Sequence, residues 1–180
     1  GRKPKGKDDC AGAKEQRWKN ARVTVFGMKQ AKNAPVAKDA QVKLLLDAET
    51  PAVTIFGKSS ELQVEHVLRV SAEENRQMIY DTVRHLKKRG REVIYDAEHF
   101  FDGAKDDWEH ALLTLEAAVD GGADLVVLGA TNGGSLTEEV GDMTARVISR
   151  LVQAGGIRPT TDSGVAVGSV LAATLAVLPF

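Results

Sequence analysis

The feature that most constrains the fold of this 180-residue chain is a recurrence of short apolar runs separated by amphipathic stretches. The runs begin near residues 23, 52, 93, 125 and 156, so they recur about every 30 to 40 residues, the length of one βα unit. Each run is continuously apolar, which is typical of a sheet covered on both faces. Because parallel neighbours need crossover helices, the repeated order of strand and helix predicts a parallel sheet.

We expect strands at residues 23–26, 52–56, 93–95 and 125–128, with a weaker fifth near 156–157. Two intervening helices carry a start signal, because Ser71 with Glu74 and Ser135 with Glu138 form the Ser-x-x-Glu pattern of a capping box. Gly90 stands where the C-terminal cap of the first helix belongs. Apolar stripes predict the buried helix faces: Met78, Ile79, Val83 and Leu86; Leu112, Leu115 and Val119; Val140, Met143, Val147 and Leu151.

The fold class that follows is α/β, either doubly wound or an arc of a (β/α)8 barrel. No G-x-G-x-x-G turn follows the first run, which weakens the dinucleotide-binding version. A complete barrel needs about 250 residues, and this chain shows about five βα units. The helix expected at residues 165–178 carries apolar side chains almost all round, so we expect it to be buried on every side. We therefore predict a partial (β/α)8 TIM barrel that forms one incomplete domain over residues 23–180.

Residues 1–22 carry eight Lys or Arg and three acidic residues, in a chain of net charge −1. We interpret them as a basic, solvated and partly flexible lead-in; contact with RNA would be the alternative, but interleaved aromatic residues are absent. A lone cysteine, Cys10, allows no intrachain disulfide, which favours a reducing cytoplasm. No secretory h-region is visible, and the apolar tail is too short to span a bilayer. We expect neither a nucleic-acid nor a membrane partner.

Ionisable side chains crowd together where the third apolar run ends, in REVIYDAEHFFDG at residues 91–103. Residues 93–95 have the β-branched and aromatic character of a buried strand. Asp96, Glu98, His99 and Asp102 then follow within seven positions. In parallel α/β folds, ligands bind at the carboxyl ends of the strands. This segment is therefore the candidate site.

Two long motifs stand out, LLLDAETPAVTIFGKS at residues 44–59 and RGREVIYDAEHFFDG at residues 89–103. Shorter ones are residues 22–27, 122–124, 131–134 and 162–164. In sequence and in order along the chain, these motifs resemble those of the citramalate synthases. The citramalate synthases belong with the isopropylmalate and homocitrate synthases and the hydroxymethylglutaryl-CoA lyases. The resemblance runs from about residue 20 to residue 175.

The resemblance implies a metal-dependent TIM-barrel acyltransferase of the pyruvate type. Such an enzyme deprotonates the methyl group of acetyl-CoA, adds the enolate to the keto carbon of a 2-oxo acid and releases CoA. For a citramalate synthase, pyruvate is the 2-oxo acid and the product feeds isoleucine synthesis. By the same resemblance, Glu98 serves proton transfer and Thr131 hydrogen-bonds the substrate carboxylate. Asp96 and His99 are expected to bind substrate beside Glu98.

The family's cation ligands are not matched. The family's Asp-Thr-Thr-Leu-Arg-Asp-Gly motif would precede the first residue, and its two ligand histidines are replaced by Arg158 and Thr160. Ala130 stands where the family has an aspartate. A divalent cation, Mg²⁺ or Mn²⁺, is expected for the family because it polarises a keto oxygen. We assign no metal site to this chain.

Each candidate residue also has a structural alternative. Glu98 could be satisfied by backbone donors, Lys58 or Arg91, and Thr131 could be a turn residue before Gly133 and Gly134. Asp96 and His99 could be structural as well. Lys58 is expected to be a solvated lysine at a strand end.

Two hypotheses for the whole chain follow, and they belong to different classes. The first is the central part of a citramalate-synthase-like barrel that uses acetyl-CoA and a 2-oxo acid. The second is a non-catalytic truncated or decayed copy that folds with a partner or by self-association. A third and weaker hypothesis is a binder of small molecules or nucleotides. Since an arc of barrel leaves two open sheet edges, we expect a homo-oligomer.

Overall fold

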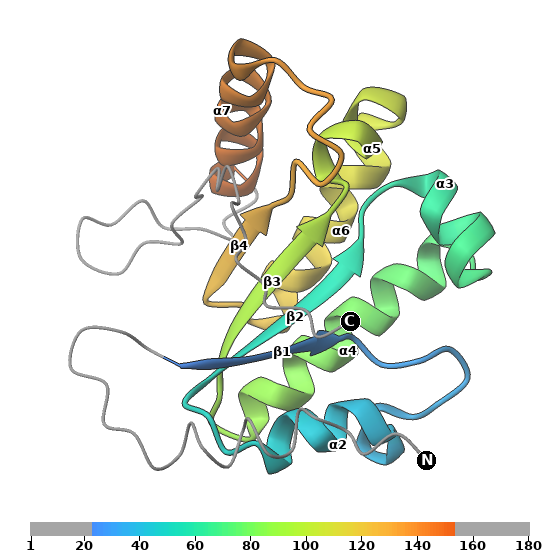
Figure 1. Ribbon diagram of the computed structural model, residues 1–180, viewed down its shortest axis with the longest axis vertical. Coiled ribbons are helices and arrows are strands. Elements are labelled where there is room, and N and C mark those ends of the chain that lie inside the picture. The colour runs from blue at the N-terminus through green and yellow to red at the C-terminus, as the bar shows by residue number, and fades with distance from the viewer. Residues whose placement is uncertain (1–22, 154–180) are drawn as a thin grey trace.

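All four apolar runs in the described part of the chain form neighbouring strands of one parallel sheet. The computed structural model describes residues 23–153. Its strands are β1 Thr24–Met28, β2 Ala52–Lys58, β3 Glu92–Glu98 and β4 Leu125–Leu128, as Figure 1 shows. The four predicted strand positions are therefore confirmed. The fifth, near residues 156–157, lies outside the described residues.

The order of the strands in the sheet is their order in the chain, β1-β2-β3-β4, and every pair is parallel. Successive crossovers that all step the same way, each right-handed, place their helices on the same face of the sheet. In a doubly wound sheet the order of the strands reverses at a switch point. The order of the described strands shows no such reversal. This is the arrangement of a barrel arc.

The helices follow the strands as the repeated pattern predicts. They are the 3-10 turn Val36–Lys38, α2 Ala40–Asp47, α3 Glu61–Gln63 with a π-helical turn at Val64–Leu68, α4 Ala72–Lys88, α5 Phe100–Asp106, α6 Trp108–Gly121 and α7 Thr137–Gln153. Behind the sheet, α4 and α6 lie side by side (Figure 1). None of the described helices is both long enough and apolar enough to cross a membrane.

The predicted ends of α4 are confirmed. The Ser71 hydroxyl accepts a hydrogen bond of 3.0 Å from the Glu74 backbone N–H. At the other end Gly90 adopts a left-handed φ of 74°, and its N–H bonds the Lys87 carbonyl while that of Arg91 bonds the Leu86 carbonyl. These two bonds form a Schellman motif, which satisfies carbonyls that the helix leaves free.

The predicted cap of α7 is wrong by one position. The helix begins at Thr137, and the buried Ser135 hydroxyl has no hydrogen-bond partner in the described structure. Instead the Glu139 carboxylate accepts a 2.8 Å bond from the Leu136 N–H. Glu139 also pairs with Lys105 at 2.9 Å, and this second partner favours the shifted start.

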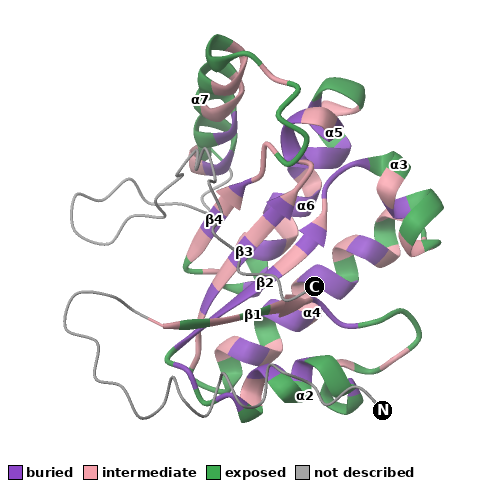
Figure 2. Cartoon of the chain, viewed as in Figure 1, coloured by how far each residue is buried: buried purple, intermediate pink, exposed green. Residues whose placement is uncertain are grey.

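Among residues 23–153, helices cover one face of the sheet, whereas the sequence analysis expected cover on both. Val93, Tyr95 and Ala97 of β3 are buried against the helices, whereas the alternating residues are only partly buried. Figure 2 shows that β1 is coloured exposed and intermediate, whereas β2 is mostly buried. On β1, Phe26 is 55% exposed and stacks on Phe56 at a centroid distance of 5.2 Å. We call the face with Phe26, Phe56 and Lys58 the open face. In a closed barrel this face would line the interior.

The remaining domain-level predictions are not tested. The basic segment at residues 1–22 and the apolar helix expected at residues 165–178 lie outside the described residues. The assignment of residues 23–180 to one domain therefore stays a prediction.

Two glycine-to-alanine substitutions are expected to change stability in opposite directions. Gly90→Ala places a side chain at a left-handed φ and should lower the free energy of unfolding by about 1 kcal/mol. Gly141→Ala, inside α7 and facing open space, should raise it by about 0.5 to 1 kcal/mol. Urea denaturation followed by circular dichroism measures both. If both substitutions changed the free energy of unfolding in the same direction, the Schellman motif at the end of α4 would be contradicted.

Candidate active site at the carboxyl ends of the strands

The parallel register of β2 and β3 brings Lys58 and Glu98 side by side. They are paired residues of the two strands, and Lys58 Nζ lies 2.6 Å from Glu98 Oε2. Their side chains are only 16% and 23% exposed. An ion pair of this length in a partly desolvated site is stronger than one on the surface. Lys58 is therefore not the solvated lysine that the sequence analysis expected, because its partner on the next strand removes it from water.

Asp96 lies two residues before Glu98, on the same open face. Its register partners are Phe56 on β2 and Val127 on β4, so apolar side chains flank it. Burial, reinforced by the Glu98 carboxylate and opposed by the Lys58 ammonium, raises the pKa of Asp96 to about 6. A carboxyl group with such a pKa is partly protonated near neutral pH and can donate or accept a proton.

His99 and Thr131 meet at the same edge of the sheet. His99 has a left-handed φ of 57°, and its backbone N–H donates a 2.9 Å hydrogen bond to Thr131 Oγ1. The next loop residue, Asn132, donates through Nδ2 to Asp102 Oδ2 at 2.9 Å. His99 Nδ1 is buried and has no hydrogen-bond partner in the described structure. The imidazole nitrogen is thus a polar atom that the described residues leave unpaired.

The four predicted site residues therefore lie at one rim, although their contacts also fit the structural alternatives. Glu98 has the Lys58 partner that the alternative named, whereas Arg91 lies before β3 and donates to the carbonyls of Thr50 and Leu46. Thr131 stands in a turn and holds the His99 backbone. Their roles toward a substrate stay predictions.

Lys29 is a strand-end residue that the sequence analysis missed. It follows β1 and is fully buried, with Nζ 3.7 Å from Met78 Sδ on α4. Burial lowers the pKa of Lys29 to about 8, and the Glu74 carboxylate opposes that shift. Its side chain is turned toward the helices, away from the open face. Only its position directly after an apolar run could have signalled burial.

The described residues do not fit a divalent cation. Nowhere in residues 23–153 do three or more His, Cys, Asp or Glu side chains come together to hold a metal ion. At the rim the Lys58 ammonium already lies against Glu98, and this positive charge disfavours a cation there. Arg158 and Thr160, which stand at the family's histidine positions, lie outside the described residues.

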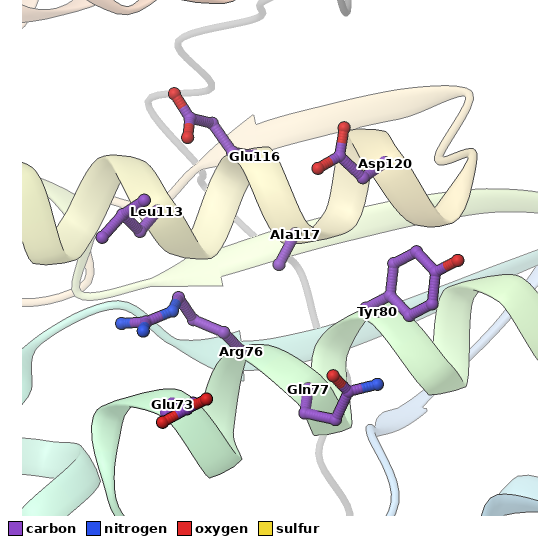
Figure 3. A pocket seen from close by; sticks show the side chains of 8 residues that line it. All are labelled: Glu73, Arg76, Gln77, Tyr80, Leu113, Glu116, Ala117 and Asp120. Atoms are coloured by element: carbon purple, nitrogen blue, oxygen red, sulfur yellow. The ribbon is translucent and has the colours of Figure 1, made fainter.

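A separate groove of about 320 Å³ lies between α4 and α6 (Figure 3). Three carboxylates and one guanidinium line it: Glu73, Glu116, Asp120 and Arg76. These side chains lie on the solvent side of the two helices, whose buried faces, such as Ile79 and Leu115, are turned inward. The groove lies on the outer side of α4 and α6 and not on the open face, and we assign it no part in the site.

Comparison with known proteins finds related sequences. The HMGL-like family profile matches residues 7–176. The (R)-citramalate synthase of Aquifex aeolicus is 51% identical over 165 residues, and that of Sulfolobus acidocaldarius is 36% identical over 173 residues. The alignments cover 91% and 96% of this chain but 31% and 33% of those proteins. The chain thus spans about a third of the length of these curated relatives.

Solved structures identify the fold. The HMG-CoA lyase of Brucella melitensis superposes with a TM-score of 0.63 at 16% identity, covering 81% of this chain and 49% of that one. The Bacillus subtilis HMG-CoA lyase gives 0.61 at 16% identity, covering 79% and 46%. The predicted partial TIM barrel is confirmed.

Asp96→Asn is expected to stabilise the protein at pH 7. The pKa of Asp96 is raised on folding, so the folded state binds more protons and stability falls as the pH rises from about 4 to 6. The asparagine amide of the variant does not ionise, so the variant does not lose this stability as the pH rises. After a discount for partial exposure, we expect a gain of about 1 kcal/mol at pH 7 that disappears at pH 4. Urea unfolding at both pH values measures it, and a gain independent of pH would contradict the assignment.

Thr131→Val should loosen the backbone at His99, because it removes the acceptor of the His99 N–H. We expect faster amide hydrogen exchange at His99 and a loss of about 1 kcal/mol in unfolding free energy. Thr131→Ser keeps the hydroxyl and should preserve the slow exchange. If the amide of His99 exchanged at the same rate in the valine and serine variants, the hydrogen bond would not hold this loop.

Proposed function

The chain belongs to the HMGL-like family, and we propose on this basis that it carries part of the active site for condensing acetyl-CoA with a 2-oxo acid. The observation that carries the proposal is the ion pair of Lys58 and Glu98, with Asp96 beside it, at the carboxyl-terminal edge of the sheet. In TIM barrels this edge is where catalysis takes place. The high identity to a citramalate synthase supports pyruvate as the 2-oxo acid.

Glu98 is the base in this proposal. Its carboxylate takes a proton from the acetyl methyl group, and the enolate carbon bonds to the keto carbon of the 2-oxo acid. The keto oxygen becomes an alkoxide, which takes up a proton. Asp96, with a pKa of about 6, is partly protonated near neutral pH and is suited to supply it. Water then cleaves the thioester and releases CoA.

Thr131 and His99 position the 2-oxo acid. The Thr131 oxygen accepts from the His99 N–H, so the threonine hydroxyl proton is left to donate to a carboxylate. The buried His99 Nδ1 can contact a substrate oxygen if it carries the proton. Both residues lie in segments that follow adjacent strands, so one small ligand can reach both. No step is assigned to the family's divalent cation, because residues 23–153 hold no group of side chains that fits it.

A non-catalytic fragment that associates with a partner or with itself is the second candidate. The open face favours it, since Phe26 is 55% exposed. Strands β1 and β4 each have one neighbour among the described strands, which leaves an edge on each side of the sheet. We propose that the protein forms a homo-oligomer through these surfaces.

Glu98→Gln tests the catalytic proposal. We expect the wild-type protein to release CoA from acetyl-CoA and pyruvate, with Mg²⁺ or Mn²⁺ present, and the glutamine variant to lose at least about 100-fold in rate. A thiol-reactive dye measures the release, and Cys10 adds at most one background thiol per chain. Glu138→Gln, an exposed carboxylate on α7, is the matched control. No release from folded wild-type protein would contradict the proposal and favour the fragment.

A further inference from the structure

We propose that the Lys58 ammonium binds the carboxylate of the 2-oxo acid, and that this carboxylate displaces the Glu98 carboxylate from Lys58. The inference rests on the proposed function and deepens it. In the structure the Lys58 ammonium contacts Glu98 at 2.6 Å. A substrate carboxylate that takes the place of Glu98 keeps the ammonium paired and leaves the Glu98 oxygen open to a proton. Substrate binding would thus prepare the base.

Lys58 is the cation on the open face of the described sheet. Side chains alternate between the two faces of each strand, so the residues that share the face of Lys58 follow from the register. Glu92, Asp96 and Glu98 are the carboxylates among them, and the others carry apolar or hydroxyl side chains. An anion that reaches the face therefore meets one ammonium among the described strands.

Lys29 cannot substitute for it. Although Lys29 also follows a strand, its side chain is fully buried beneath α4 and contacts Met78. Lys58 keeps 16% of its side chain exposed and reaches solvent at the rim. The two lysines thus point to opposite sides of the same sheet, and the accessible one stands beside the proposed base.

The ammonium also has unused hydrogen-bonding capacity. A lysine carries three N–H donors, and Lys58 Nζ has one acceptor among the described residues, Glu98 Oε2. A second anion can therefore approach before the first leaves, so the ammonium stays paired throughout the exchange. The Lys58 backbone is fixed meanwhile, because its carbonyl accepts a 3.0 Å bond from Asn75 Nδ2.

The test compares binding of pyruvate with binding of pyruvamide, which has nearly the same shape and no charge. Ligand-observed NMR titration of the full chain gives both dissociation constants. We expect Lys58→Met to weaken pyruvate binding by about 10- to 100-fold and to leave pyruvamide binding nearly unchanged. Lys58→Arg keeps the charge and should retain the preference for the acid. Circular dichroism confirms that each variant is folded.

Lys87→Met is the matched control, because Lys87 Nζ makes a similar ion pair, 2.7 Å from Asp124 Oδ2. This pair lies at the amino-terminal end of the strands, since Asp124 directly precedes β4. The control variant should leave the ratio of the two dissociation constants unchanged. The proposal is overturned if Lys58→Met leaves that ratio unchanged, if it weakens both ligands equally, or if folded wild-type protein binds no pyruvate at millimolar concentrations. Preferential pyruvate binding without CoA release would instead refute the proposed function and leave the Lys58 assignment standing.

Discussion

The register that pairs β2 with β3 is the constraint on which the core and the rim both depend. It turns Val53 and Val93 toward the helices and, five residues further along, sets Lys58 beside Glu98 on the opposite face. Because side chains alternate, a slip of one residue would exchange the two faces of a strand. The burial of the core against α4 and α6 therefore also holds the ion pair in place. Stability and site geometry share one cause.

Burial and the charges at the rim together set the pKa of Asp96. One ammonium faces Glu98 and Asp96, and it lies against Glu98. Asp96 remains between Phe56 and Val127, where burial and the Glu98 charge raise its pKa to about 6. Asp96 is thus the carboxyl group suited to hold a proton near neutral pH, beside the paired Glu98.

The sequence predicted the elements whose signals are local and missed the features that depend on neighbouring segments. Continuous apolar runs located all four described strands, and Ser71 marked the start of α4. The Ser135 signal failed because Glu139, tied to Lys105 on α5, caps one position later. The Lys58 ion pair could not be predicted, since it requires the register between strands. The open face could not be predicted either, because a continuous apolar run carries no record of which face helices cover.

The loops at the rim continue the pairing of the strands, and this explains how one site is built from separate βα units. The Ser59 N–H bonds the Glu98 carbonyl, and the Phe100 N–H bonds the Gly129 carbonyl. Gly103 of α5 lies so close to Ser59 that a Cβ would come within 2.7 Å of its carbonyl oxygen. The left-handed backbone of His99 costs about 1 kcal/mol, and the bond to Thr131 offsets part of it. Each rim residue is thus held by the neighbouring unit, so the geometry of the site is a property of the sheet and not of any single loop.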